Sequence, residues 1–220
     1  MEDKSETSPS TSNRTEFSDF VIKNAQRYFH ELNMPPEQKE RVNKKMLILP
    51  YGSVARGNAS EVKSDLDLMF IENDASEHQS IMPLTDGVYH KDGTSLGQYI
   101  VNEYEKNHPN IRKERSLHVY PEYVGEIEVD NPHILVDDLI NAIENDTLEE
   151  IPRRGGGHSN AAVLGLILNI DPQLAIIGDP IVFEQIKTKI KTSLKGKIEA
   201  EKKINEAYNR FVQWKNTEDD

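Results

Sequence analysis

Two short apolar segments constrain the fold more than any other feature of this chain. Residues 46–49 (Met-Leu-Ile-Leu) end at Pro50, and residues 66–71 are apolar except for Asp67. Short apolar runs bounded by turn-forming or polar residues are typical of strands. Gly52 lies in the turn between them. The sequence therefore predicts two strands of a small sheet, joined by a segment that begins with a glycine turn.

The segments around these strands carry mostly helical patterns. Apolar residues recur at helical spacing from Phe17 to Leu32, behind a cap at Thr15 or Ser18, and Pro35-Pro36 ends this pattern. A proline one residue after Asp179 is typical of a helix start. Further helices are expected at 96–107, 133–144, 160–169, from 180 onwards and from 198 to 214, and further strands at 117–120 and 124–129.

This order of elements predicts an α+β (α/β) fold. A small mixed-sheet domain is expected from about 15 to 131, followed by a helical domain from about 132 to 216. Residues 1–14 are charged and rich in serine and threonine, so they are expected to be disordered because they lack apolar surface to bury. A chain of 220 residues with 36% hydrophobic composition is long enough for one good-sized core or two small ones.

Composition excludes several classes of site and partner. The chain has no cysteine, which rules out disulfides, thiolate zinc sites and cysteine nucleophiles. No apolar run is long enough to span a bilayer, and the N-terminus does not resemble a signal peptide, so a cytoplasmic protein without a membrane partner is expected. The net charge of −12 disfavours nucleic acid and favours a small or cationic partner, although Arg112, Lys113 and Arg115 form a local basic strip.

The aspartates of the second strand point to metal chemistry. Residues two apart in a strand share a face, so Asp65 and Asp67 are expected to project together while Leu66 and Leu68 turn into the core. Adjacent carboxylates repel unless a cation lies between them. Hard oxygen ligands on a site that is open to water and phosphate suit Mg²⁺.

The glycine turn supplies features that suit a phosphate. Gly52 lets backbone amides approach a ligand closely, and Ser53 adds a hydroxyl donor. Arg56 either adds a positive charge for a polyphosphate or pairs with an acid such as Glu61. Taken singly, Gly-Ser is a common turn and Asp-Leu-Asp is an ordinary surface strand. Their order and spacing, with a strand before and after the turn, favour a joint site.

The segment from Gly52-Ser53 to Asp65-Leu66-Asp67 resembles the signature of the DNA polymerase β-like nucleotidyltransferase superfamily. Gly-Ser-Val-Ala-Arg-Gly followed by Ser64-Asp-Leu-Asp-Leu is most similar to aminoglycoside nucleotidyltransferases and to the minimal nucleotidyltransferases of toxin-antitoxin pairs. The likeness covers residues 47–71. It implies a mixed sheet flanked by helices, two Mg²⁺ ions, and ATP or another nucleoside triphosphate held by Gly52, Ser53, Arg56 and Ser64.

The same resemblance implies an enzyme that transfers a nucleoside monophosphate to an acceptor hydroxyl and releases pyrophosphate. Asp65 and Asp67 would bind both ions, and the helical residues 133–216 would form an acceptor-binding wall or the surface of a homodimer. A small-molecule acceptor is favoured over nucleic acid. The alternatives are the same chemistry on a protein or tRNA, and a nucleotide-binding regulatory protein with a degraded site.

The resemblance also implies a third carboxylate, which acts in catalysis and in metal binding. Glu128 has the expected context because Ile127 and Val129 flank it. Glu126 would share its face, Glu122 and Asp130 remain alternatives, and His118 stands at the equivalent place of the preceding strand.

Other polar motifs are assigned to structure. The glycine run 155–157 lacks the lysine of a phosphate loop and is interpreted as a linker, with His158 and Ser159 capping the next helix. Arg153 and Arg154 are interpreted as a solvated pair. The alternative is that they reach a triphosphate from across the cleft. His78 and His90 are interpreted as loop histidines, because no second ligand stands at metal-binding spacing.

Overall fold

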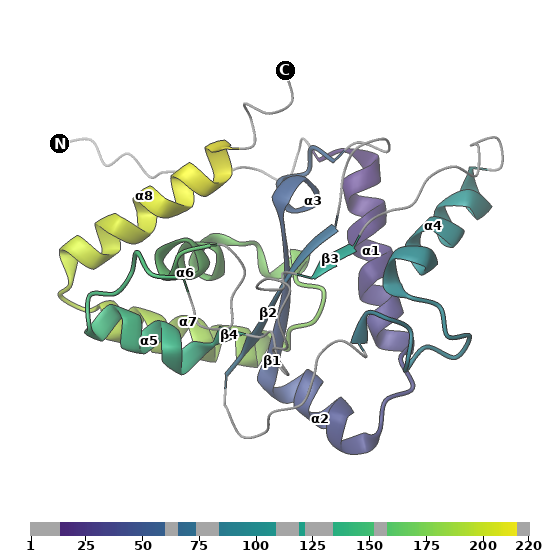
Figure 1. Ribbon diagram of the computed structural model, residues 1–220, viewed down its shortest axis with the longest axis horizontal. Coiled ribbons are helices and arrows are strands. Elements are labelled where there is room, and N and C mark those ends of the chain that lie inside the picture. The colour runs from purple at the N-terminus through teal and green to yellow at the C-terminus, as the bar shows by residue number, and fades with distance from the viewer. Residues whose placement is uncertain are drawn as a thin grey trace.

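The architecture is a central sheet with helices on both sides (Figure 1). Helices α1, α2 and α4 lie on one side of the sheet, and helices α5 to α8 lie on the other. This arrangement confirms the predicted α+β class. The structure is a computed structural model that describes residues 14–59, 66–73, 84–108, 119–121, 134–151 and 158–214, with the backbone alone described for 119–121 and 211–214.

The sheet is mixed and is built around strand β2. Strand β1 (Met46–Tyr51) pairs antiparallel with β2 (Leu66–Glu72), with Met46 opposite Glu72 and Tyr51 opposite Asp67. The other long side of β2 pairs in parallel with β3 (Val119–Pro121) near its start and with β4 (Ile134–Leu135) near its end. Strand β2, which carries Asp67, is therefore the central strand of the sheet.

The structure corrects one predicted strand boundary and one predicted helix boundary. The proline at position 50 was expected to stop β1, yet the strand continues through it to Tyr51. The N–H of Ile48 points away from β2 and donates to Ile177 O. By the strand period, the backbone nitrogen of Pro50 also points away from β2, so the missing N–H of this proline costs no bond of the β1–β2 ladder. The helix expected from residue 133 begins only at Val136, because Ile134 and Leu135 form β4.

The N-terminal helices follow the sequence signals closely. Helix α1 (Glu16–Glu31) has Thr15 as its N-cap, and α4 (Leu96–Asn107) has Ser95. A short helix, α3 (Gly52–Arg56), follows β1 directly.

Helix α2 (Pro36–Lys45) was not predicted, because its apolar stripe is too narrow to show a helical period. Its proline at the first turn and its lysines in the last turn were the available signals.

The C-terminal half is helical, as the sequence predicts. Helices α6 and α7 begin behind the serine and aspartate caps at positions 159 and 179, whose side chains accept hydrogen bonds from first-turn N–H groups. This half consists of α5 (Val136–Glu144), α6 (Asn160–Asn169), the 3₁₀ helix η3 (Pro172–Leu174), α7 (Pro180–Leu194) and α8 (Ile198–Trp214).

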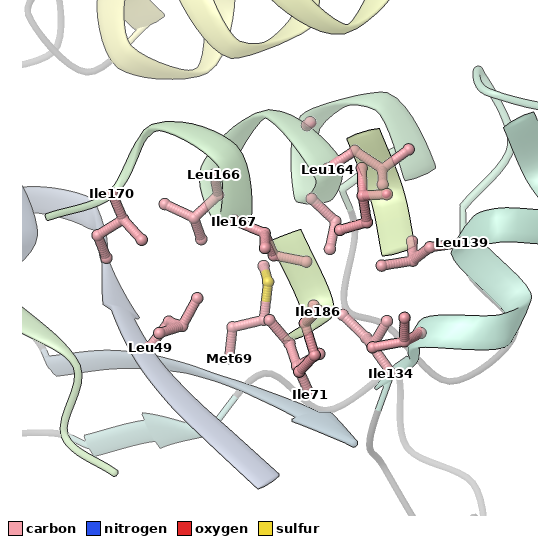
Figure 2. Packing of buried hydrophobic residues seen from close by; sticks show 14 of the residues in the cluster. Leu49, Met69, Ile71, Ile134, Leu139, Leu164, Leu166, Ile167, Ile170 and Ile186 are labelled. Atoms are coloured by element: carbon pink, nitrogen blue, oxygen red, sulfur yellow. The ribbon is translucent and has the colours of Figure 1, made fainter. Parts of the chain in front are cut away.

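Alternate residues of β2 enter two separate hydrophobic cores. Leu66 and Leu68 pack with α1 and α4, whereas Met69 and Ile71 pack with α5 to α8. Figure 2 shows Met69 and Ile71 beneath Ile167 of α6. The sheet therefore separates the core into an N-terminal face, towards α1, α2 and α4, and a C-terminal face, towards α5 to α8. Two isoleucines in the first turns of α7 and α8, Ile181 and Ile198, are 67% and 75% exposed.

A buried ion pair joins the far end of β2 to α2. The guanidinium of Arg41 donates Nε to Glu72 Oε1 at 2.8 Å and a terminal nitrogen to Oε2 at 2.9 Å. The side chains are 5% and 0% exposed, so the two charges compensate each other inside the N-terminal core.

The first described residue, Arg14, is part of the fold, although composition assigns it to the tail. Its guanidinium donates to the carbonyls of Val54 and Ala55 at 2.8 and 2.7 Å, at the C-terminal end of α3. The N–H of Thr15 donates to Gly57 O at 2.7 Å beside them. The entry to α1 therefore holds α3 in place. Residues 1–13 lie outside the described part.

No helix in the described ranges has both the length and the apolar character needed to cross a bilayer.

Candidate functional site

The candidate site is built at the junction between β1 and α3. Gly52 has a φ of +67°, in the left-handed region that favours glycine. A Cβ added to Gly52 would lie 2.1 Å from Oδ2 of Asp67, far closer than a Cβ approaches a non-bonded atom. The carboxylate therefore lies directly against the glycine backbone. Two glycine properties, positive φ and a missing side chain, are both used at this position.

The face on which Asp67 lies agrees with the strand period predicted from sequence. Asp67 is half-buried, while its neighbours Leu66 and Leu68 are fully buried in the N-terminal core. Directly opposite residues of an antiparallel pair share a face, so Asp67 lies on the same face as its partner Tyr51. Tyr51 belongs to the core beneath α6 and α7, so Asp67 projects from the C-terminal face of the sheet.

The Gly-Ser turn leads into α3, as expected. Ser53 and Arg56 are both half-buried on this helix of five residues. Gly57 ends the helix with a φ of +80°, and a Cβ there would lie 2.7 Å from Cγ of Arg14. The predicted nucleotide-binding residues of this turn are therefore fixed between the Asp67 carboxylate at the start of the helix and Arg14 at its end.

The strand next to Asp67 is β3. In the parallel register Asp67 lies opposite Tyr120, with Leu66 opposite Val119. Several residues proposed for the site or its surroundings lie outside the described ranges: Ser64, Asp65, Glu122, Glu126, Glu128, Asp130, His118, Glu61, His78, Arg112, Lys113, Arg115, Arg153, Arg154 and the glycines 155–157. The structure thus describes Gly52, Ser53, Arg56 and Asp67, and brings Gly52 and Asp67 into contact.

Sequence reasoning assigned His158 to the cap of the next helix and missed its contact with the sheet. Its ring lies edge-on to the ring of Tyr51, with the centroids 5.4 Å apart and the planes at 84°. Tyr51 is 5% exposed, whereas His158 is half-buried. Ser159 alone supplies the side-chain cap of α6. The available signal was the position of His158, directly after a glycine run and before a helix cap, where a side chain is free to turn towards the sheet.

The resemblance implies Mg²⁺, and the described part of the site fits it in one respect. The Asp67 carboxylate lies directly against the backbone of Gly52, and a carboxylate is a hard oxygen ligand of the kind that Mg²⁺ prefers. Among the described residues there is no group of three histidine, cysteine or acidic side chains that would complete a metal site. Asp65 or another acid from the remaining stretches is needed.

A second cluster of titratable rings lies away from this site, on the N-terminal face. His90 stacks on Tyr28 with centroids 5.1 Å apart, and Tyr99 packs edge-on against both rings. His90 is 6% exposed, and its two ring nitrogens have no hydrogen-bond partner. Burial raises the pKa of Tyr28 to about 12. Since these rings pack on the opposite core from Asp67, they stabilise the fold rather than form part of the candidate site.

Comparisons of the chain with protein families, with curated proteins and with solved structures gave no match.

Proposed function

We propose that this chain is a Mg²⁺-dependent nucleotidyltransferase. It transfers a nucleoside monophosphate, AMP from ATP, to an acceptor hydroxyl and releases pyrophosphate. The observation that carries this proposal is the contact between Gly52 and the Asp67 carboxylate at the start of α3. A metal-binding acid and a phosphate-binding turn must lie side by side in this chemistry, and the contact between Asp67 and Gly52 supports that arrangement in this chain.

Each residue has a part in the proposal. Gly52 and Ser53 bind the triphosphate through backbone N–H groups and the hydroxyl, and Arg56 adds positive charge. Asp67, with Asp65 and Glu128 as further proposed ligands, holds Mg²⁺. When bound, Mg²⁺ neutralises charge on the triphosphate and lowers the proton affinity of the attacking hydroxyl.

The proposed acceptor is a small molecule. The net charge of −12 disfavours a polyphosphate chain and suits a small or cationic acceptor. The same chemistry on a protein or a tRNA is the competing proposal. A tRNA acceptor would make activity fall steeply with salt concentration, because counterions are released on binding. We further propose a cytoplasmic location.

The decisive test is pyrophosphate release from ATP, GTP, CTP and UTP with Mg²⁺, in the presence of pooled small-molecule, protein or tRNA acceptors. We expect release with ATP and one class of acceptor, and loss of that release in Asp67→Asn. Asp138→Asn is the matched control, since Asp138 is also a half-buried aspartate but lies on α5. Binding of triphosphates without release from any pool would favour the regulatory alternative.

The stability of the variants separates a catalytic role from a structural one. Removing one of two repelling carboxylates should not destabilise the metal-free protein, so Asp67→Asn should unfold at the same temperature as the wild type. A large fall in Tm in metal-free buffer would make Asp67 a structural acid. Glu128→Gln should lower the rate of release far more than it weakens ATP binding, and unchanged turnover would transfer the third-carboxylate role to Glu126 or another acid.

A further inference from the structure

The helical half of the chain places an imidazole on the Asp67 face of the sheet. The ring of His158 packs against Tyr51, and Tyr51 lies directly opposite Asp67 in the β1–β2 register. Cβ atoms of directly opposite residues are about 5 Å apart. Tyr51 is buried, whereas His158 and Asp67 are half-buried, so both residues border the core on this face of the sheet.

The position of His158 is held by the start of α6. Ser159 caps this helix through Ala162 N at 3.3 Å. Asn160 donates its backbone N–H to Glu150 O at 2.8 Å and its side-chain amide to Thr147 O at 3.0 Å. These bonds fix the backbone on the C-terminal side of His158. The imidazole is therefore presented to the sheet by a fixed helix start, and such preorganisation is what a group that acts on a substrate requires.

His158 and Asp67 are both next to Tyr51, but through different parts of that residue. Tyr51 contacts His158 through its ring and lies opposite Asp67 in the sheet register. A substrate held at the Asp67 carboxylate would therefore lie on the face of the sheet to which the imidazole is presented. If His158 only packed against the Tyr51 ring, another side chain of similar shape could replace it. If it lies beside the reacting phosphate, a ring nitrogen can accept the proton of the attacking oxygen.

We propose that His158 is the proton acceptor of the transfer reaction. This inference rests on the proposed nucleotidyltransferase function. As the acceptor oxygen forms its bond to the α-phosphorus of ATP, its proton passes to a ring nitrogen of His158, and the bond from the α-phosphorus to the bridging oxygen breaks. The electron pair of that bond leaves with pyrophosphate, and the imidazolium later releases its proton to water. A positioned base of this kind contributes about 10² to 10⁴ in rate.

The test compares His158→Ala with His108→Ala. His108 is a matched control because it is also half-buried and packs on a tyrosine: its ring centroid lies 4.1 Å from that of Tyr104. It differs in position, because it follows α4 on the other side of the molecule. With the acceptor pool that supports release, we expect kcat to fall by about 10² or more in His158→Ala alone. Added free imidazole should restore at least a tenfold increase in that variant and have no effect on His108→Ala.

Two further measurements remove the remaining ambiguity. Calorimetric titration with α,β-methylene-ATP should give the same Kd for His158→Ala and the wild type within about twofold, because a proton acceptor acts on the other reactant. In NMR spectra, addition of this analogue should shift the ring signals of His158 and leave those of His108 in place. If His158→Ala loses its fold, His158→Asn serves in its place with the same rescue assay.

The outcomes separate this inference from the proposed function. Release that depends on Asp67 but is unchanged in His158→Ala, or that is lost there without imidazole rescue, overturns the role of His158 and leaves the transferase standing. Absence of release from the wild type with every nucleotide and acceptor overturns both.

Discussion

The two acids of β2, Asp67 and Glu72, have opposite environments. They are five positions apart, so one projects from the C-terminal face and the other from the N-terminal face. Glu72 is fully buried and receives two hydrogen bonds from Arg41, which compensate its charge within the protein. Asp67 is half-buried and lies against the backbone of Gly52.

The two environments predict different consequences of substitution. A buried carboxylate with a bidentate partner contributes to the fold, and removing one partner leaves an uncompensated charge. Asp67 is a proposed Mg²⁺ ligand, and under that proposal its removal should change chemistry rather than folding. The two acids therefore make opposite predictions for the same kind of substitution, an acid to its amide.

The largest loss of stability is expected for Glu72→Gln. This change removes the negative charge from a buried pair in which the carboxylate accepts two hydrogen bonds, which costs about 3–5 kcal/mol. Guanidinium unfolding of Glu72→Gln and Asp67→Asn, side by side, should show this loss in the first variant and little change in the second. Glu40→Gln is the control, because its ion pair with Lys44 is exposed and should not shift the midpoint measurably. Equal losses for the two acids would break the comparison.

A smaller loss is expected on the C-terminal face, for Gly165→Ala. A Cβ at Gly165 of α6 would lie 2.6 Å from Cβ of Tyr208 and 3.2 Å from the carbonyl oxygen of Ile204, both on α8. The two helices must separate, and overpacking of this kind costs about 1–3 kcal/mol, partly offset by about 1 kcal/mol of helix propensity. Urea unfolding measures the net change. A more stable variant would show that the two helices have room to shift.

Gly52→Ala should combine a modest loss of stability with a large loss of turnover. Its φ of +67° costs an alanine about 1–2 kcal/mol, and the Asp67 carboxylate must also be displaced from its place. Gly196→Ala is the control, because Gly196 has a φ of +81° and no atom within 4 Å of the added Cβ. The two variants should have similar Tm values, while pyrophosphate release should be lost only in Gly52→Ala.

The smallest effect at neutral pH is expected for Tyr28→Phe, on the N-terminal face. The change removes a hydrogen bond to Thr94 O, worth about 1 kcal/mol. Because burial raises the pKa of Tyr28 to about 12, the unfolded chain ionises from about pH 10 while the folded protein keeps the proton. Stability that is present below pH 10 is therefore lost as pH rises towards 12, by up to about 3 kcal/mol.

Urea unfolding at pH 8, 10 and 11.5 tests this assignment. The wild type should lose more stability than Tyr28→Phe between the last two values. Parallel profiles for the two proteins would assign the alkaline loss to other groups.

Local signals predicted much of the fold and the face of the sheet on which Asp67 lies. Helices α4 and α6 have the predicted limits, and caps such as Ser159 and Asp179 mark their helices because a single side chain satisfies a first-turn N–H. The strand period correctly predicted that the Asp67 side chain projects from one face of the sheet and those of Leu66 and Leu68 from the other. These features depend on residues that are close in sequence.

Features that depend on distant residues were not predictable. Strand β4 has two residues, so its own sequence carries no period, and it exists because Ile71 and Glu72 of β2 are available for pairing. The contact between His158 and Tyr51 likewise joins segments from the two halves of the chain. The bidentate bond between Arg41 and Glu72 is of the same kind, since neither residue stands out in the sequence.

The open edge of β1 is protected against pairing with another molecule. Ile48 donates its N–H to Ile177 O at 2.8 Å and accepts the N–H of Ile176 at 2.8 Å, so its outward groups are used within the chain. The next outward position is Pro50, which has no N–H to offer. An incoming strand would thus find few free partners along this apolar strand. Pro50, which was expected to end the strand, therefore disfavours edge-to-edge aggregation through β1.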